Sequence, residues 1–356
     1  MTSKKTLVKK ANPQTRLTDF VKNVYANIHV TTDNYLARRP HRSFRRTRRR
    51  DYVRSLKMPG YWSFSNYTIK TLLRHKKVFL LLALAYALLT ILLVGMASQD
   101  TYNTLTSTLS QTSGDVFKGN FGQIGQAGLL FLTIISGGIS QSLSEGQQIY
   151  ASIIVLLTWL TTVWMLRNIL AGKKVKLRDG LYNAGAPILP TFIVGLVLIT
   201  QLIPLALALI GYSAASTTGL LSNGVEAMLF WIVAGLLTIL SLYWITSTIV
   251  ALVVVTLPGM YPFQAIKTAG DLVIGRRVRI MMRLIWMAVW TFIAWVVVML
   301  PIILLVNWLN SVWPALQGVS IIPVAIVALS SLTIVWVAGY VYLLYRKVVA
   351  DDADPA

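Results

Sequence analysis

Eight arginines crowd into a thirteen-residue stretch near the N-terminus of this 356-residue chain, and no lysine lies among them. A guanidinium group grips phosphate oxygens through two parallel hydrogen bonds and stacks on bases, whereas a lysine offers a point charge. Like charges at this density repel one another, so we expect an extended segment that binds an anionic partner. This arginine cluster consists of Arg38, Arg39, Arg42, Arg45, Arg46, Arg48, Arg49 and Arg50.

Three kinds of partner fit the arginine cluster. Anionic lipid headgroups attract nearby basic residues by roughly 1 kcal/mol each. RNA or DNA, ribosomal RNA included, would release counterions and bind in a strongly salt-dependent way. An acidic protein surface is the third. The cluster could also only fix membrane topology, although Arg74, Lys76 and Lys77 already lie beside the first apolar stretch.

Residues that could catalyse a reaction are missing from the apolar part of the chain. Its six long apolar stretches contain no Asp, Glu, Lys or Arg, and ionisable groups are the usual mark of a site inside a bilayer. There is no Cys, and the only histidines are His29, His41 and His75. Neither a zinc-protease, a phosphate-loop nor a serine-hydrolase motif occurs. We therefore expect no catalytic residue, no metal site and no cofactor, and predict that the protein is not an enzyme.

The composition is that of an integral membrane protein. Hydrophobic residues make up 55% of the chain and charged residues 13%, against roughly 25% charged in soluble proteins. This excludes an ordinary cytosolic enzyme and a disordered nucleic-acid-binding chain. We predict an all-α membrane domain over residues 78–348. Its six apolar stretches, each about as long as a bilayer-spanning helix, are 78–97, 149–166, 188–211, 227–256, 284–306 and 321–344.

The distribution of charge predicts the topology. Residues 1–77 hold 20 of the 33 Lys and Arg, and with six spans only Lys118 falls on the other side of the membrane. Because basic loops stay in the cytoplasm, we expect both termini there, in a bacterial inner membrane. Residues 98–148 are then extracytoplasmic. Whether the short apolar stretch 128–139 dips into the bilayer stays open, and the acidic residues 349–356 read as a solvated end.

The basic tail, residues 1–77, is expected to contain short amphipathic helices. Apolar residues recur at helical spacing over 17–28. Residues 59–77 read as an interfacial helix that turns into the first span. Aromatic rings beside a span are typical of the headgroup layer, and the membrane-interface candidates are Tyr61, Trp62, Phe64 and Tyr67.

Two prolines predict helix kinks. Pro204 and Pro301 lie in the outer halves of the third and fifth spans. Broken helices at matching positions of two repeats can mark a transport site, although prolines also kink spans for packing alone. Polar residues that could serve such a site are Thr200, Gln201, Ser241, Thr246, Ser247 and Thr248.

Each of the two long basic loops is expected to contain an amphipathic elbow helix at the cytoplasmic surface. In the second, Phe263, Ile266, Ala269, Val273 and Ile274 share one side of a helix that begins at Pro262. In the first, Val175, Leu177, Leu181 and Ala184 give a weaker version of such a face.

The elbows carry a resemblance to a known family. The spacing Pro262-x-x-Ala265-Ile266-x-x-Ala269-x-x-Leu272-x-x-Gly275, with Val175-x-Leu177-x-x-Gly180-Leu181-x-x-Ala184 in the first loop, resembles the membrane domain found beside glycerophosphodiester phosphodiesterases and its stand-alone bacterial relatives. The resemblance covers residues 149–306 and implies about six spans with cytoplasmic elbows. The phosphodiesterase domain is absent, so no catalytic residue is implied, and the arginine cluster is not part of the family pattern.

Taken together, the sequence predicts a membrane scaffold or tether whose tail docks an anionic partner, either lipid headgroups or RNA and ribosomes. A transporter of a lipid or neutral solute is the alternative that Pro204 and Pro301 favour. An accessory subunit of a larger membrane complex is another, suggested by Trp286, Trp290 and Trp295 at helical spacing.

Overall fold

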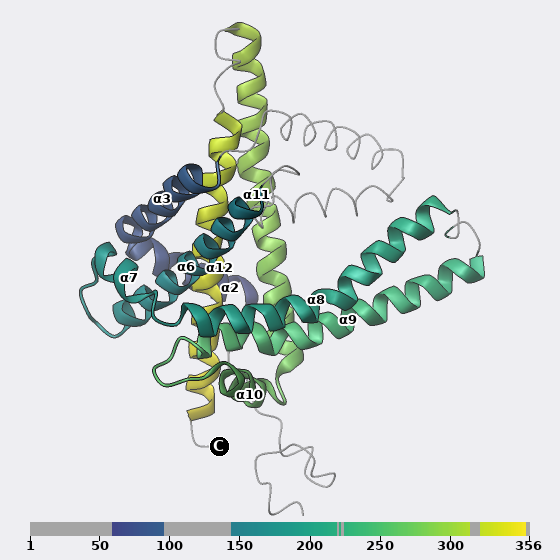
Figure 1. The fold of residues 1–356 in the computed structure, drawn as a ribbon, viewed down its shortest axis with the longest axis horizontal. Coiled ribbons are helices and arrows are strands. Elements are labelled where there is room, and N and C mark those ends of the chain that lie inside the picture. The colour runs from purple at the N-terminus through teal and green to yellow at the C-terminus, as the bar shows by residue number, and fades with distance from the viewer. Residues whose placement is uncertain (1–58, 96–143, 219–220, 222–223, 314–320, 354–356) are drawn as a thin grey trace, which may run out of the picture. The chain divides into compact units, whose positions relative to one another are not determined.

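The computed structural model describes residues 59–95, 144–218, 221, 224–313 and 321–353, and these contain helices and connecting turns but no strand (Figure 1). The chain divides into two compact units, residues 1–54 and 55–356, and everything described below belongs to the second. Its helices are α2 (Tyr61–Arg74), α3 (Lys76–Leu93), α6 (Glu145–Leu170), α7 (Leu177–Asn183), α8 (Ile188–Thr217), α9 (Gly224–Val254), α10 (Pro262–Val273), α11 (Arg277–Val312) and α12 (Ile321–Ala353).

Six of these helices are long and apolar enough to cross a membrane, which confirms the predicted all-α, six-span architecture. They are α3, α6, α8, α9, α11 and α12. Several begin before the apolar stretch does. At α6, Ser144 Oγ accepts a hydrogen bond from the N–H of Gln147, whose Oε1 accepts one from the N–H of Ser144. This capping box supplies partners for the first turn and starts the helix four residues before the predicted span.

The predicted continuous turn from interfacial helix into first span is interrupted at one residue. His75 leaves the helical conformation (φ −117°, ψ 32°), so α2 and α3 are separate helices. The first span also ends earlier than predicted, at Leu93, and Gly95 follows it with a φ of +90° that favours glycine.

The core lies where α12 meets its neighbours. This helix contacts α2, α3, α6, α9, α10 and α11. Gly339 allows the closest approach, since a Cβ there would lie 3.4 Å from the methyl groups of Leu72 and 3.6 Å from Leu166. The main hydrophobic cluster occupies the α12 half that contains Tyr340, Leu344 and Val348. A second, smaller cluster joins α11 and α12 farther along: Trp295, Met299, Val306, Ile322 and Ile326.

The helices α8 and α9 run side by side as a hairpin (Figure 1). In the most apolar segment of each helix, only 11% of the residues are buried in α8 and 6% in α9, compared with 44% in α6 and in α12. Apolar side chains exposed along a span face lipid or another membrane protein, because hydrocarbon is the solvent there. The hairpin is therefore the part of the domain with the most surface left for the bilayer.

Three predictions fall outside the described residues: the amphipathic helix over 17–28, the arginine cluster and the apolar stretch 128–139.

Candidate functional site: the basic end of the membrane domain

Every Lys and Arg among the described residues belongs to a segment at one end of the spans. These segments are α2 with the start of α3, the end of α6 with α7, α10 with the start of α11, and the end of α12. The acidic residues Glu145 and Glu226 begin α6 and α9 at the opposite end. The order of the helices thus places the described basic residues at one end of the spans, which agrees with the charge separation predicted from the sequence.

Direct contacts gather these basic segments. Arg276 Nη1 donates to the carbonyl of Val348 at 3.3 Å, which ties the start of α11 to α12. Arg167 Nη1 donates to the carbonyl of Thr256 at 3.0 Å, which ties the end of α6 to the residues after α9. We call this face of the molecule the basic end.

Arg283 connects Pro59 and the start of α2 to the basic end. It is 8% exposed, and its Nη2 donates to the carbonyl of Pro59 at 2.9 Å. The guanidinium carbon also lies 5.1 Å from the ring centroid of Tyr61 and 5.7 Å from that of Phe64, within the range of cation–π attraction. In the part of the chain that the structure describes, Nη1 has no hydrogen-bond partner. One buried cation therefore fixes the first described residues of the chain against α11.

The aromatic residues of α2 divide between the core and the surface. Phe64 is fully buried, edge-on to Tyr340 with ring centroids 4.9 Å apart, so this predicted membrane-interface residue packs inside the protein instead. Trp62 is 61% exposed and Tyr61 and Tyr67 are also exposed, as a place in the headgroup layer requires.

Three tryptophans of α11, namely Trp286, Trp290 and Trp295, make contacts within the protein. Trp286 Nε1 donates to Ser65 Oγ at 3.1 Å. Trp290 packs edge-on against Trp62, and the buried Trp295 donates to Thr333 Oγ1 at 2.8 Å. The three tryptophans that suggested a subunit interface thus have partners on α2 and α12.

Both predicted elbow helices are present, and their buried faces agree with the prediction in part: Ala269, Val273 and Ala184 are buried as expected, whereas Phe263 is not. In α10 the fully buried residues are Ala265, Ala269 and Val273, whereas Phe263 is 77% exposed. Small side chains at i, i+4 and i+8 let the helix lie close against α9, and a phenylalanine on that face would hold it away.

The first elbow, α7, sits even closer to its span. A Cβ on Gly180 would come within 2.9 Å of Met165 Cγ and 3.2 Å of Thr161 Cγ2, both on α6. Only glycine permits this contact without movement of Met165. Leu181, which the pattern predicted on the packed face, is exposed.

Pro204 lies within α8, and its surroundings are hydrogen-bonded. Proline disrupts the backbone ladder, and the N–H of Leu205 donates to Ser241 Oγ on α9 at 3.2 Å. Ser241 in turn donates to the carbonyl of Gln201 at 2.6 Å, so its hydroxyl bridges the interrupted ladder. Thr248 Oγ1 donates to Gln201 Oε1 at 2.7 Å. Pro301 lies within α11, which continues through it to Val312.

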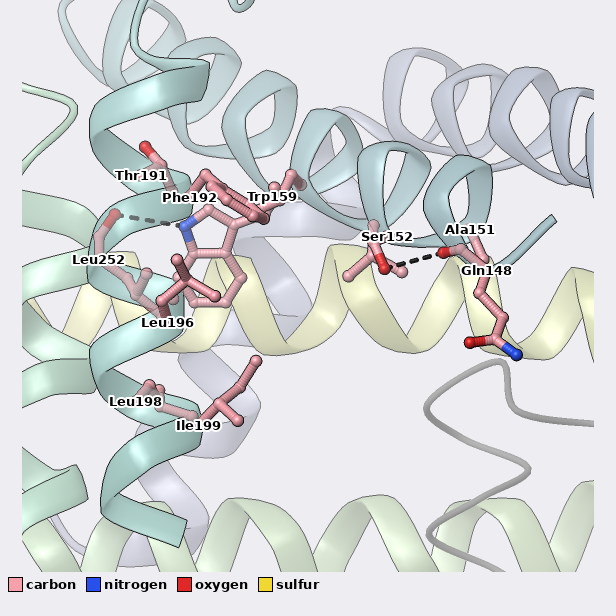
Figure 2. Close-up of a pocket in the computed structure, with 13 residues that line it drawn as sticks. Gln148, Ala151, Ser152, Trp159, Thr191, Phe192, Leu196, Leu198, Ile199 and Leu252 are labelled. Atoms are coloured by element: carbon pink, nitrogen blue, oxygen red, sulfur yellow. Dashed lines mark hydrogen bonds between the residues drawn. The ribbon is translucent and has the colours of Figure 1, made fainter. Parts of the chain in front are cut away.

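A cleft opens between α6 and α8, which is the first helix of the hairpin (Figure 2). Its volume is about 500 Å³, and its walls are mostly apolar. The helices approach each other near Trp159 and Thr191 and separate toward Ser152 and Ile199 (Figure 2). Trp159 closes the narrow end, where its Nε1 donates to the carbonyl of Leu252 at 3.4 Å. None of the described residues that line the cleft is charged, so these walls suit an apolar or neutral molecule.

No three His, Asp or Glu side chains in the described ranges come together as metal ligands. The sequence did not single out Arg283 or the cleft. Arg283 lies 224 residues from its partner, so no local pattern pairs them. Gly180 was part of the predicted elbow spacing, but its close contact with Met165 on another helix was not predicted.

Comparison with known proteins finds no matching family model, no similar curated protein and no similar solved structure. The resemblance of residues 149–306 to the phosphodiesterase-associated membrane domain therefore stays a prediction.

Proposed function

We propose that this protein is a non-enzymatic scaffold or tether of the bacterial inner membrane, whose arginine cluster docks an anionic partner at the cytoplasmic face. The observation that carries the proposal is the anchoring of residue 59 at the basic end. The part of the tail that precedes Pro59, which includes the arginine cluster, joins the membrane domain at a point held by the bond between Arg283 and the Pro59 carbonyl and by the burial of Phe64.

A tether needs such a fixed point, because a docked partner is held to the membrane domain only through a segment that is packed against that domain. The charge at this end adds to the attraction, since every described Lys and Arg lies there. An anionic partner drawn to the positive arginine cluster would also be attracted by the positive charge of the basic end.

The proposal is tested by crosslinking RNA and lipid to the protein in intact cells. Replacing the eight arginines of the cluster by Gln is expected to abolish partner recovery while membrane insertion stays unchanged. The matched control replaces the same eight by Lys, which keeps the charge. If docking uses paired phosphate hydrogen bonds, the Lys variant loses most of the binding as well. Unchanged recovery with the Gln variant would contradict the proposal.

The cleft between α6 and α8 favours a second candidate, a transporter of a lipid or neutral solute. Gly195 lines the cleft, and a Cβ there would meet nothing within 4 Å. Gly195→Leu should therefore fill the cleft without disturbing the fold and should lower solute flux in proteoliposomes by about tenfold, a loss of about 1.4 kcal/mol. Gly235→Leu is the control, because Gly235 also has open space and lies on α9 outside the cleft. Equal flux in both variants would remove this candidate.

A further inference from the structure

We propose that the first elbow, residues 173–182, is a binding surface for the headgroups of anionic phospholipids. This inference goes beyond the docking role of the tail and does not depend on it. It rests on the depth at which α7 is held, on the charge of the elbow and on its exposed apolar residues.

The contact of Gly180 sets the depth of the elbow. Its partners Met165 and Thr161 lie five and nine residues before the end of α6 at Leu170. At about 1.5 Å per residue, these positions are about 8 and 14 Å before the end of α6. Helix α7 also contacts α3. The elbow is thus folded back along the spans and does not project into the water.

The elbow is strongly basic on its exposed side. Lys173, Lys174, Lys176 and Arg178 are all exposed. The one acidic residue, Asp179, faces its own helix start: Oδ2 accepts from the N–H of Lys176 at 3.4 Å, and Oδ1 lies 3.9 Å from Arg178 Nε. Three positive charges remain in excess, which complements a layer of phosphates.

Apolar residues stand beside these charges. Tyr182 is 85% exposed and Leu181 is 41% exposed, although both follow directly after the buried Gly180. Exposed aromatic and aliphatic residues next to lysines on a short helix are the features of a segment that lies in the membrane interface. At the depth set by the contact with α6, Tyr182 faces lipid at the boundary between the headgroups and the acyl chains.

The first experiment measures the depth of Tyr182 in a bilayer. The chain has no native cysteine, so Tyr182→Cys can carry a single environment-sensitive fluorophore. In vesicles of phosphatidylcholine with phosphatidylglycerol, we expect quenching by a spin label on the lipid headgroup and little quenching by aqueous iodide. Trp313→Cys is the control, since Trp313 is an exposed aromatic at the opposite end, away from the basic segments. Raising the phosphatidylglycerol content should shift the emission at 182 and not at 313.

The second experiment tests the charge. Lys173, Lys174, Lys176 and Arg178 are replaced together by Gln, and retained lipids are counted by native mass spectrometry. We expect the ratio of bound phosphatidylglycerol to phosphatidylcholine to fall about tenfold. The control neutralises four other exposed basic residues of the same end, namely Lys70, Arg74, Lys76 and Lys77.

Three results would overturn the inference. Strong iodide quenching at 182 would place the elbow in water, where a soluble partner such as RNA or protein would be the occupant. An unchanged lipid ratio in the elbow variant would show that its charges do not hold phosphates. An equal fall in the control variant would assign the effect to net charge instead of the elbow. The fluorescence result holds even if the fourfold variant folds poorly.

Discussion

At the scale of single residues, the membrane domain depends on polar groups that form hydrogen bonds with one another across helices. Ser241 both accepts from the N–H of Leu205 and donates to the carbonyl of Gln201. Backbone groups that lack partners in hydrocarbon cost several kcal/mol each, so one hydroxyl makes the interruption at Pro204 tolerable. This explains how α8 can contain a proline within a membrane span.

Replacing Ser241 by Ala is expected to destabilise the protein by about 1–3 kcal/mol, because a donor and an acceptor both lose their partner. The measurement is the free energy of unfolding in detergent micelles. Ser247→Ala is the control, since Ser247 Oγ donates only to Trp244 on its own helix. The cost should shrink in a Pro204→Ala background, where α8 can restore its own ladder. A cost that is the same in both backgrounds would contradict the bridging role.

At the scale of elements, the elbows depend on small residues more than on large apolar ones. Gly180→Val is expected to cost about 1–3 kcal/mol, because the new side chain overlaps Met165 on α6. Hydrogen exchange of α7 should become faster in the same variant. Gly185→Val serves as the control, since a Cβ on Gly185 meets nothing within 4 Å. Met165→Ala should recover part of the loss, and no recovery would show that the contact is not the cause.

The elements also show what the sequence could and could not predict. The spans were predictable from uncharged stretches, because a charge inside hydrocarbon is costly. The elbows were predictable from periodicity, and so were Ala269 and Val273 on the packed face of α10, but the burial of Ala265 and the exposure of Phe263 were not. Hydropathy ranks Phe263 above Ala265, whereas close helix packing selects the smaller residue. The bonds of Arg283 and Ser241 join residues far apart in the sequence, so a local pattern could not pair them.

At the scale of the whole molecule, the distribution of charge predicts the orientation in the membrane. In intact cells, a membrane-impermeant maleimide is expected to label Val225→Cys and not Lys174→Cys, because Val225 lies at the end where the described residues include no Lys or Arg. Both positions are exposed, and the absence of native cysteine removes any background. Labelling of both after the membrane is opened controls for reactivity. Labelling of Lys174→Cys alone in intact cells would reverse the orientation and place the arginine cluster outside.

The bond between Arg283 and Pro59 has a consequence for the order of events during synthesis. The two residues are 224 positions apart, so the ribosome completes Arg283 long after Pro59 has emerged. At about 5–20 residues per second, this interval is roughly 10–45 s. For that time α2 lacks α11 and α12, and the arginines ahead of it are already outside the exit tunnel. The docking that we propose for the tail is therefore expected to be possible in the nascent chain, before the bond between Arg283 and Pro59 exists.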